Sequence, residues 1–276
     1  MSIKISVNRN IPDNKVKNFV LFADENFGVK GLTKISLAKQ SNYINKTVIN
    51  NRQKDKDFLI FNLNSTQKIL LIKIKENLTS VENEKIGEKF YNFIKENLVI
   101  ESTFNEKNIV EFSKKNRIFF DEFLHGVRLK SYEFKKYKSK KKISSFEINV
   151  LARNRNLDLK KNKRFHSLIE GTNFTKDLVS EPGNILHPDE YAKRLAQLKK
   201  VGLKVSIYDE KKLKKLGMNA LLGVGQGSIR GSYLVTLEWK GLKSKKKPLA
   251  FVGKGVCFDT GGISLKPAKF MEDMTY

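Results

Sequence analysis

The chain has 276 residues, of which 39% are hydrophobic, and it carries a formal net charge of +25. This length accommodates one large domain or two ordinary ones, and the hydrophobic share excludes wholesale disorder. The single cysteine, Cys257, excludes an internal disulfide and fits a reducing compartment. No stretch approaches the ~18 apolar residues of a membrane span, and the first residues lack the apolar run of a signal peptide. We therefore expect a cytoplasmic protein that does not enter a membrane.

The net charge admits two interpretations. A focused basic patch would bind DNA or another acidic partner through charge. Lysine, however, far outnumbers arginine and is spread over the whole chain, with only short runs such as residues 135–136, 140–142 and 245–247. Runs of that length are typical of solvated loops. A non-catalytic DNA- or partner-binding protein, with residues 1–150 as its basic domain, is therefore kept as the alternative function.

The first 150 residues have the pattern of an α/β domain. Short apolar runs rich in β-branched and aromatic residues predict strands at residues 17–23, 58–63, 68–74 and 146–150. The second and third of these strands are expected to form a hairpin, which makes the sheet mixed. Apolar residues at helical spacing predict helices at residues 82–96 and 106–125.

The composition changes near residue 150. Residues 131–144 are basic and are expected to form an exposed connection. A long polar helix is predicted over residues 158–179, before the breaker Glu181-Pro182-Gly183-Asn184. We therefore expect an N-terminal α/β domain at residues 1–150, a connecting helix within residues 151–183, and a second α/β domain that begins at residue 184 and extends through residue 276.

The second domain is predicted to alternate between helix and strand. Helices are expected to begin at residues 187–189 and to cover residues 210–216, and strands are expected at residues 203–208, 233–239 and 249–252. This alternation predicts a mostly parallel sheet with helical crossovers.

Glycine is dense over residues 223–231 (GVGQGSIRG). A dinucleotide-binding loop would need a strand before these glycines and a helix after them. Here the glycines lead into a predicted strand. The pattern therefore favours a flexible or tightly turned loop.

Residues 251–267 (FVGKGVCFDTGGISLKP) carry the strongest chemical signal. The predicted strand at residues 249–252 delivers Lys254 to its carboxyl end, where open parallel sheets place their ligand sites. Asp259, paired glycines and Lys266 follow. Two lysines and an aspartate beside glycines indicate a negatively charged or metal-bound reaction centre. From the residues alone a phosphate site is equally compatible, and solvated lysines with Asp259 capping a turn is the structural alternative.

The same segment resembles the signature of the leucyl aminopeptidase (cytosol aminopeptidase) family of two-metal metallopeptidases, V-G-K-G-[IV]-[TC]-F-D-[ST]-G-G-[IL]-S-[IL]-K-P. Residues 175–184 (TKDLVSEPGN) and 216–228 (LGMNALLGVGQGS) resemble two further motifs of this family. Residues 123–138 are similar to the end of its N-terminal domain. The resemblance is in register over residues 123–276, whereas the earlier residues match only in predicted pattern.

The resemblance implies that the second domain is the first part of a larger α/β catalytic domain. It implies Lys254 as an amine ligand of one of two divalent metal ions and Asp259 as a carboxylate that bridges both. Lys266 would polarise the scissile carbonyl or stabilise the oxyanion, and Met274 would line the pocket for the substrate's first side chain. Manganese or zinc would serve, and magnesium is a further option, because a lysine with carboxylates selects weakly among them.

The implied function is removal of N-terminal residues, leucine-type preferred, from peptides in intracellular protein turnover. The family's next ligand is an aspartate two residues after Thr275, and its N-T-D-A-E-G-R segment supplies further carboxylates; neither falls within these 276 residues. We therefore expect a C-terminally truncated, N-terminal fragment that is inactive alone, and a homo-hexamer for the complete family form.

Four other side chains complete the expectations. His125, His166 and His187 are scattered and are expected at the surface or at helix ends rather than as metal ligands. Cys257 is expected to be a small buried side chain rather than a nucleophile.

Overall fold

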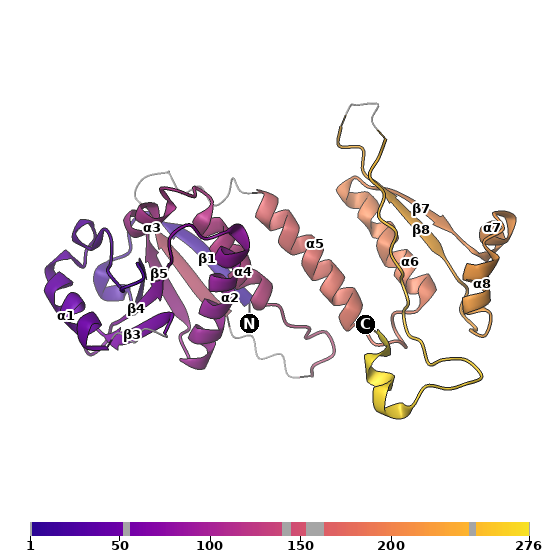
Figure 1. The fold of residues 1–276 in the computed structure, drawn as a ribbon, viewed down its shortest axis with the longest axis horizontal. Helices are drawn as coiled ribbons and strands as arrows, with labels where there is room; N and C mark the ends of the chain where they lie inside the picture. Colours follow the sequence, from indigo (N-terminus) through magenta and orange to yellow (C-terminus); the bar gives the residue numbers. More distant parts are fainter. Residues whose placement is uncertain (1, 52–55, 140–144, 153–162, 243–246, 276) are drawn as a thin grey trace. The chain divides into compact units, whose positions relative to one another are not determined.

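The computed structural model describes residues 2–51, 56–139, 145–152, 163–242 and 247–275 (Figure 1). The chain divides into two compact units, Met1–Asn173 and Phe174–Tyr276, and the division falls within helix α5 (Lys163–Ser180). A helix therefore occupies the place in the chain where the connecting helix was predicted, although its predicted first residues, 158–162, lie outside the described residues. So do residues 140–144 of the expected basic connection. The three-part division at residues 150 and 183 stays a prediction.

In the described part of the N-terminal unit, six strands form one sheet in the order β1-β6-β5-β2-β4-β3. Their bounds are β1 (Ser2–Asn8), β2 (Asn18–Ala23), β3 (Phe58–Asn62), β4 (Lys68–Lys73), β5 (Glu101–Asn105) and β6 (Ser145–Leu151). The neighbouring strands are parallel except for the antiparallel β3–β4 hairpin. The predicted mixed sheet is confirmed, and β1 and β5 are additional strands whose polar residues obscured the strand pattern.

The helices described beside this sheet are α1 (Ser41–Asn51), α2 (Ser80–Glu96), α3 (Glu106–Ser113) and α4 (Phe119–Lys130). Short 3₁₀ helices lie at η1 (Asp13–Lys15), η2 (Leu32–Lys34) and η3 (Ala38–Gln40). The prediction of one helix at residues 106–125 was wrong. Asn116 accepts a hydrogen bond from the Ile118 backbone N–H at 3.0 Å and donates one to Glu122 at 2.8 Å. This local turn separates α3 from α4, because an asparagine side chain offers the backbone an alternative to helical bonding.

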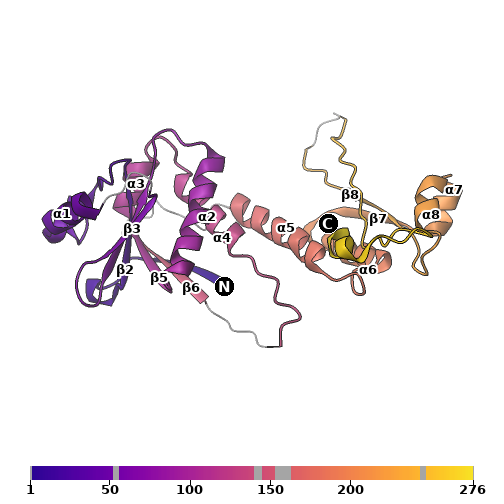
Figure 2. The ribbon, with the colours of Figure 1, turned by 60° about the horizontal axis from the view of Figure 1, so that its bottom comes forward.

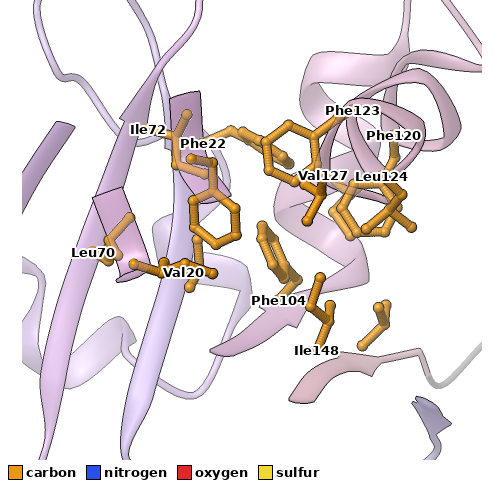
Figure 3. Packing of buried hydrophobic residues seen from close by; sticks show 14 of the residues in the cluster. Val20, Phe22, Leu70, Ile72, Phe104, Phe120, Phe123, Leu124, Val127 and Ile148 are labelled. Atoms are coloured by element: carbon orange, nitrogen blue, oxygen red, sulfur yellow. The ribbon is translucent and has the colours of Figure 1, made fainter. Parts of the chain in front are cut away.

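Apolar side chains fill both faces of the sheet. On the α2–α4 face, the rings of Phe22, Phe104 and Phe123 meet, with ring centroids 5.3–5.8 Å apart (Figure 3). On the other face, Leu21 and Leu71 pack in a second buried cluster that includes residues of α1. Figure 2 shows α2 and α4 on one side of the strands and α1 on the other. Strands β2 and β4 are buried on both faces, which explains their near-continuous hydrophobic sequences.

A side-chain amide forms hydrogen bonds with the backbone at the carboxyl end of β2. Strands β2 and β5 pair only at Phe19–Thr103 and Val20–Phe104. Beyond this point the buried Asn108 of α3 accepts from the Phe22 N–H at 2.7 Å and donates to the Phe22 carbonyl at 3.1 Å. Parallel sheets commonly bind ligands where neighbouring strands diverge in this way. Here the amide of Asn108 occupies the gap and satisfies the β2 backbone.

Helices α2 and α4 approach closely because each has a glycine at the contact. A Cβ atom added at Gly87 would lie 2.0 Å from the Phe123 carbonyl oxygen, and one added at Gly126 would lie 1.9 Å from the Glu84 carbonyl oxygen. Side chains at these positions would force the helices apart. Every buried residue between α4 and the sheet would then shift with them.

We expect Gly87→Ala to lower the free energy of unfolding by about 1–3 kcal/mol or more, because the added methyl group overpacks the helix contact. Gly171→Ala is the matched control, since it also lies inside a helix but its added Cβ would meet nothing within 4 Å. The control should raise stability by up to about 1 kcal/mol. Urea denaturation followed by circular dichroism measures both, and equal behaviour of the two variants would contradict the assignment of a tight contact.

The second unit has helices α6 (Pro188–Ala196), α7 (Glu210–Lys215) and α8 (Asn219–Gly225), with 3₁₀ helices η4 (Gln197–Val201) and η5 (Ala268–Thr275). Its strands are β7 (Lys204–Tyr208) and β8 (Leu234–Glu238). These two strands pair antiparallel, so the predicted mostly parallel sheet was wrong for the described residues. The glycine-rich stretch is a loop only after Gly225, because α8 includes its first glycines.

The predicted strand at residues 249–252 was also wrong. These residues have no regular secondary structure, and the Phe251 side chain is 88% exposed. Figure 1 draws the described chain from residue 247 up to η5 without a helix or an arrow. Among the described residues, β7 and β8 form a two-stranded sheet, and residues 249–252 pair with neither strand. Within the described residues, no helix is long and apolar enough to cross a membrane.

Candidate metal and substrate site

A tight backbone turn closes residues 259–266. The Gly261 N–H donates to Asp259 Oδ1 at 2.9 Å, and the Lys266 N–H donates to the Thr260 carbonyl at 2.9 Å. Gly261 and Leu265 form a β-bridge across the turn. Gly261 has φ +99°, and an added Cβ would lie 2.5 Å from the Ser264 carbonyl oxygen, so a glycine is required here. The turn returns Lys266 to the side of Asp259.

The turn brings together three of the four residues that the sequence singled out. Lys266 Nζ lies 2.9 Å from Asp259 Oδ2 and 3.1 Å from Met274 Sδ, in η5. The hydrogen bond from Lys266, with that from the Gly261 backbone, holds the pKa of the Asp259 carboxyl below its usual range. Asp259 therefore carries a negative charge at neutral pH, balanced by the Lys266 ammonium.

Lys254, the fourth residue, is exposed. Its positive charge also lowers the pKa of Asp259, so the two residues lie close enough to interact electrostatically. In the part of the chain that the structure describes, no hydrogen bond or ion pair joins them. Because the preceding strand is absent, Lys254 is not at a strand end as predicted, and the irregular segment positions it instead.

Residues 255–258 pack against the start of the second unit. A Cβ atom at Gly183 would lie 2.9 Å from Phe258 Cβ, so this glycine lets the neighbour of Asp259 come close. Cys257 is half-buried, and burial followed by the nearby charge of Asp189 raises the pKa of its thiol. A raised pKa disfavours the thiolate, which agrees with the expectation that Cys257 is not a nucleophile.

A buried ion pair fixes the turn that contains Gly183. Arg194 of α6 donates to Glu181 at 2.7 Å through Nη1 and to Glu190 at 3.0 Å through Nε. The Glu181 side chain is only 1% exposed. The sequence indicated Glu181 only as part of a helix breaker, because the arginine that binds it lies 13 residues further along the chain. The sequence feature that could have indicated a structural role for Glu181 is its position directly before Pro182-Gly183.

The three histidines have different environments. His187 precedes α6 and its Nδ1 lies 2.5 Å from Asp189 Oδ1, and His166 is exposed on α5, as expected. For His125 the expectation was wrong. It is buried within α4, where its Nδ1 lies 2.8 Å from Glu84 Oε1 across the α2–α4 contact.

Arg194→Met should destabilise the second unit by about 2–4 kcal/mol, because the buried Glu181 carboxylate would lose its guanidinium. Arg230→Met is the matched control. Arg230 pairs with Asp189 at 3.2 Å, but both side chains are substantially exposed, so its loss should cost less than about 1 kcal/mol. Hydrogen exchange at the backbone amides of residues 183–196 measures the local effect. Similar exchange in the two variants would exclude the proposed difference.

The described residues offer few donors for a divalent cation. Within the described ranges, no three His, Cys, Asp or Glu side chains converge as a metal cluster. The donors at the turn are the Asp259 carboxylate and, in its neutral form, the Lys254 amine. The Lys266 ammonium already binds Asp259 as a cation would, so this carboxylate accepts positive charge in its present geometry. Catalytic zinc usually has three protein ligands, more than these two.

Solved structures with a similar fold include leucine and cytosol aminopeptidases. A tomato leucine aminopeptidase mutant matches 99% of this chain and 57% of its own, with a TM-score of 0.74 and 20% identity. Cytosol aminopeptidase from Coxiella burnetii matches 98% of this chain and 53% of its own, with a TM-score of 0.67 and 19% identity. The bottromycin maturation enzyme BotP in complex with Mn has a TM-score of 0.64, at 18% identity, over 94% of this chain and 52% of its own. The chain therefore has the leucine aminopeptidase fold.

Sequence comparisons also match cytosol aminopeptidases. Residues 173–276 match the model of the cytosol aminopeptidase family, catalytic domain. Proteins named "Probable cytosol aminopeptidase" from Phytoplasma australiense and Caulobacter vibrioides are 48% and 49% identical over 154 and 156 residues, or 55% of this chain. The alignments cover 31% and 32% of those relatives, so the chain spans about a third of their length. Over this region the chain is similar to the cytosol aminopeptidase family, which confirms the resemblance.

Proposed function

We propose that this chain supplies part of the active site of a metal-dependent aminopeptidase that releases N-terminal, leucine-type residues from peptides. The observation that carries the proposal is the Asp259–Lys266–Met274 cluster inside the family-matched region. In this proposal Lys254 and Asp259 are ligands of a two-metal site. A bound divalent metal would supply an activated water and a positive charge at the substrate carbonyl. Lys266 would polarise that carbonyl, and Met274 would contact the substrate's first side chain.

The remaining properties of the complete enzyme are proposed with it. Manganese or zinc, and alternatively magnesium, is the proposed metal; the solved complex of BotP with Mn supports the first choice. Cytoplasmic peptides are the proposed substrates, in agreement with the names of the relatives. A homo-hexamer is the proposed assembly, and protein turnover the proposed role. The alternative of a DNA- or partner-binding protein gains no support from these comparisons, which match aminopeptidases.

Manganese binding by the 276-residue chain tests the ligand assignment. We expect saturable binding, measured by electron paramagnetic resonance of free Mn²⁺, and a loss of affinity of at least about tenfold in Asp259→Asn. Asp209→Asn removes the same charge, but Asp209 caps α7 through a hydrogen bond that asparagine also accepts. Its affinity should be unchanged. Equal binding by the two variants would refute Asp259 as a ligand.

Hydrolysis of leucyl p-nitroanilide tests the activity of the chain as it stands. With Lys254 and Asp259 as its metal ligands, the purified chain should release no p-nitroaniline above the buffer rate when manganese is added. The reason is that two protein donors are too few for a two-metal site. Release that depends on both manganese and Asp259 would contradict this expectation, and release insensitive to Asp259→Asn would indicate a contaminating peptidase.

A further inference from the structure

Strand β1 is one edge of the six-stranded sheet, and among the described strands only β6 pairs with it. The Ala152 N–H donates to the Asn8 carbonyl at 3.0 Å, so Asn8 directs its backbone groups toward β6. Successive residues of a strand direct these groups to opposite sides, so Ile3, Ile5 and Val7 direct theirs away from the sheet. In the described part of the chain, no hydrogen bond reaches these outward groups. The edge therefore offers them to another strand.

Strand β3, at the opposite edge of the sheet, is less open. The Lys73 N–H donates to the Asp57 carbonyl at 2.8 Å, which by the same alternation makes Asn62 an outward-facing residue. The Tyr43 hydroxyl of α1 donates to the Asn62 carbonyl at 2.9 Å and occupies this outward group. Strand β3 also has five residues, whereas β1 has seven. Strand β1 is therefore the edge more available to a partner.

The sequence of β1 is self-complementary in one antiparallel register. When Ile5 lies opposite Ile5 of a second copy, Ile3 lies opposite Val7. Lys4 then lies opposite Ser6. The outward-facing residues form the hydrogen-bonded pairs of the ladder in this register. It places β-branched aliphatic side chains opposite one another and sets no two β1 charges directly opposite, which favours strand pairing. Each contact would occur twice, because the register has twofold symmetry.

Pairing in this register would cover apolar surface that a single chain leaves exposed. The side chains of Ile3 and Ile5 are partly buried and pack against the core on the α2–α4 face, and Val7 is 45% exposed. A second copy would extend this apolar layer. On the other face of the sheet, Lys4 Nζ lies 3.7 Å from Glu147 Oε1, which offsets the positive charge brought to the contact.

We propose that the outward edge of β1 is an interaction surface for a second copy of this chain, and that two copies join their sheets through antiparallel β1 strands. This inference does not depend on metal binding or on the proposed aminopeptidase function. A contact between two strands buries little surface, so the dimer is weak and forms at high protein concentration. Each chain carries a net charge of +25, so added salt should strengthen the dimer by screening the repulsion.

Sedimentation velocity of the whole chain over a range of concentrations, at about 0.15 M salt, measures the dimer dissociation constant. Two substitutions at Ser6 test the register, and both remove the same hydrogen bond from Ser6 to Asn149. Ser6→Glu places a carboxylate opposite Lys4 of the second copy and should tighten the dimer by at least about twofold. Ser6→Lys places like charges opposite each other and should weaken it by at least about twofold.

Ser65→Glu and Ser65→Lys are the matched controls for net charge. Ser65 is exposed in the hairpin between β3 and β4, which lies at the other edge of the sheet. These two variants should each change the dissociation constant by less than about 1.5-fold, because salt screens charges far from the contact.

Val7→Pro tests the backbone contact. Proline removes the outward N–H of Val7 in both copies but no hydrogen bond to β6, so the fold should persist. Loss of these two donors should weaken the dimer by at least about fivefold. Circular dichroism confirms that each variant is folded.

Opposite shifts in Ser6→Glu and Ser6→Lys that the Ser65 variants do not reproduce, together with weaker association of Val7→Pro, support the proposal. A wild-type chain that stays monomeric with and without added salt overturns it and leaves the edge to a strand of another protein. Association that is equally strong in Val7→Pro also overturns it, because the contact would then lie elsewhere. Equal shifts at Ser6 and Ser65 overturn the proposed register and indicate an effect of net charge.

Discussion

The close approach of α2 and α4 is the constraint on which the N-terminal unit depends. Gly87 and Gly126 remove the side chains that would hold these helices apart. The approach places Phe120 and Phe123 against Phe22 and Phe104 of the sheet. Each buried aromatic ring contributes about 1.5–3 kcal/mol, so small displacements at the helix contact affect a large part of the core.

The second unit places its chemistry on a different kind of scaffold. A backbone turn, rather than a strand end, brings Lys266 to Asp259. The buried Glu181–Arg194 pair fixes the turn at Gly183, and Gly183 lets Phe258 pack beside it. Asp259 follows Phe258 directly. Contacts between neighbouring residues therefore connect α6 with Asp259, the candidate metal ligand.

The two units differ in the burial of their apolar runs. In the N-terminal unit the apolar runs of β2 and β4 are buried on both faces. In the second unit Phe251 and Val252 are almost fully exposed, although the run of residues 249–252 is as apolar as a buried strand. Exposed apolar surface of this kind is typical of an interaction site. The same sequence signal therefore led to correct strands in one unit and to an incorrect strand at residues 249–252 in the other.

The sequence by itself determined the strongly patterned elements, the family resemblance, and the grouping of Asp259 with Lys266. Those features are local: a hairpin, a helical repeat, or a glycine turn that closes within eight residues. Only the tertiary structure decided the break between α3 and α4, the burial of His125, the antiparallel β7–β8 pair and the buried Glu181–Arg194 ion pair. Each of these depends on a partner distant in the sequence or on a competing side-chain hydrogen bond. Hydrophobic periodicity predicts neither of these, because it indicates which face of an element is apolar and not which residues pack against that face.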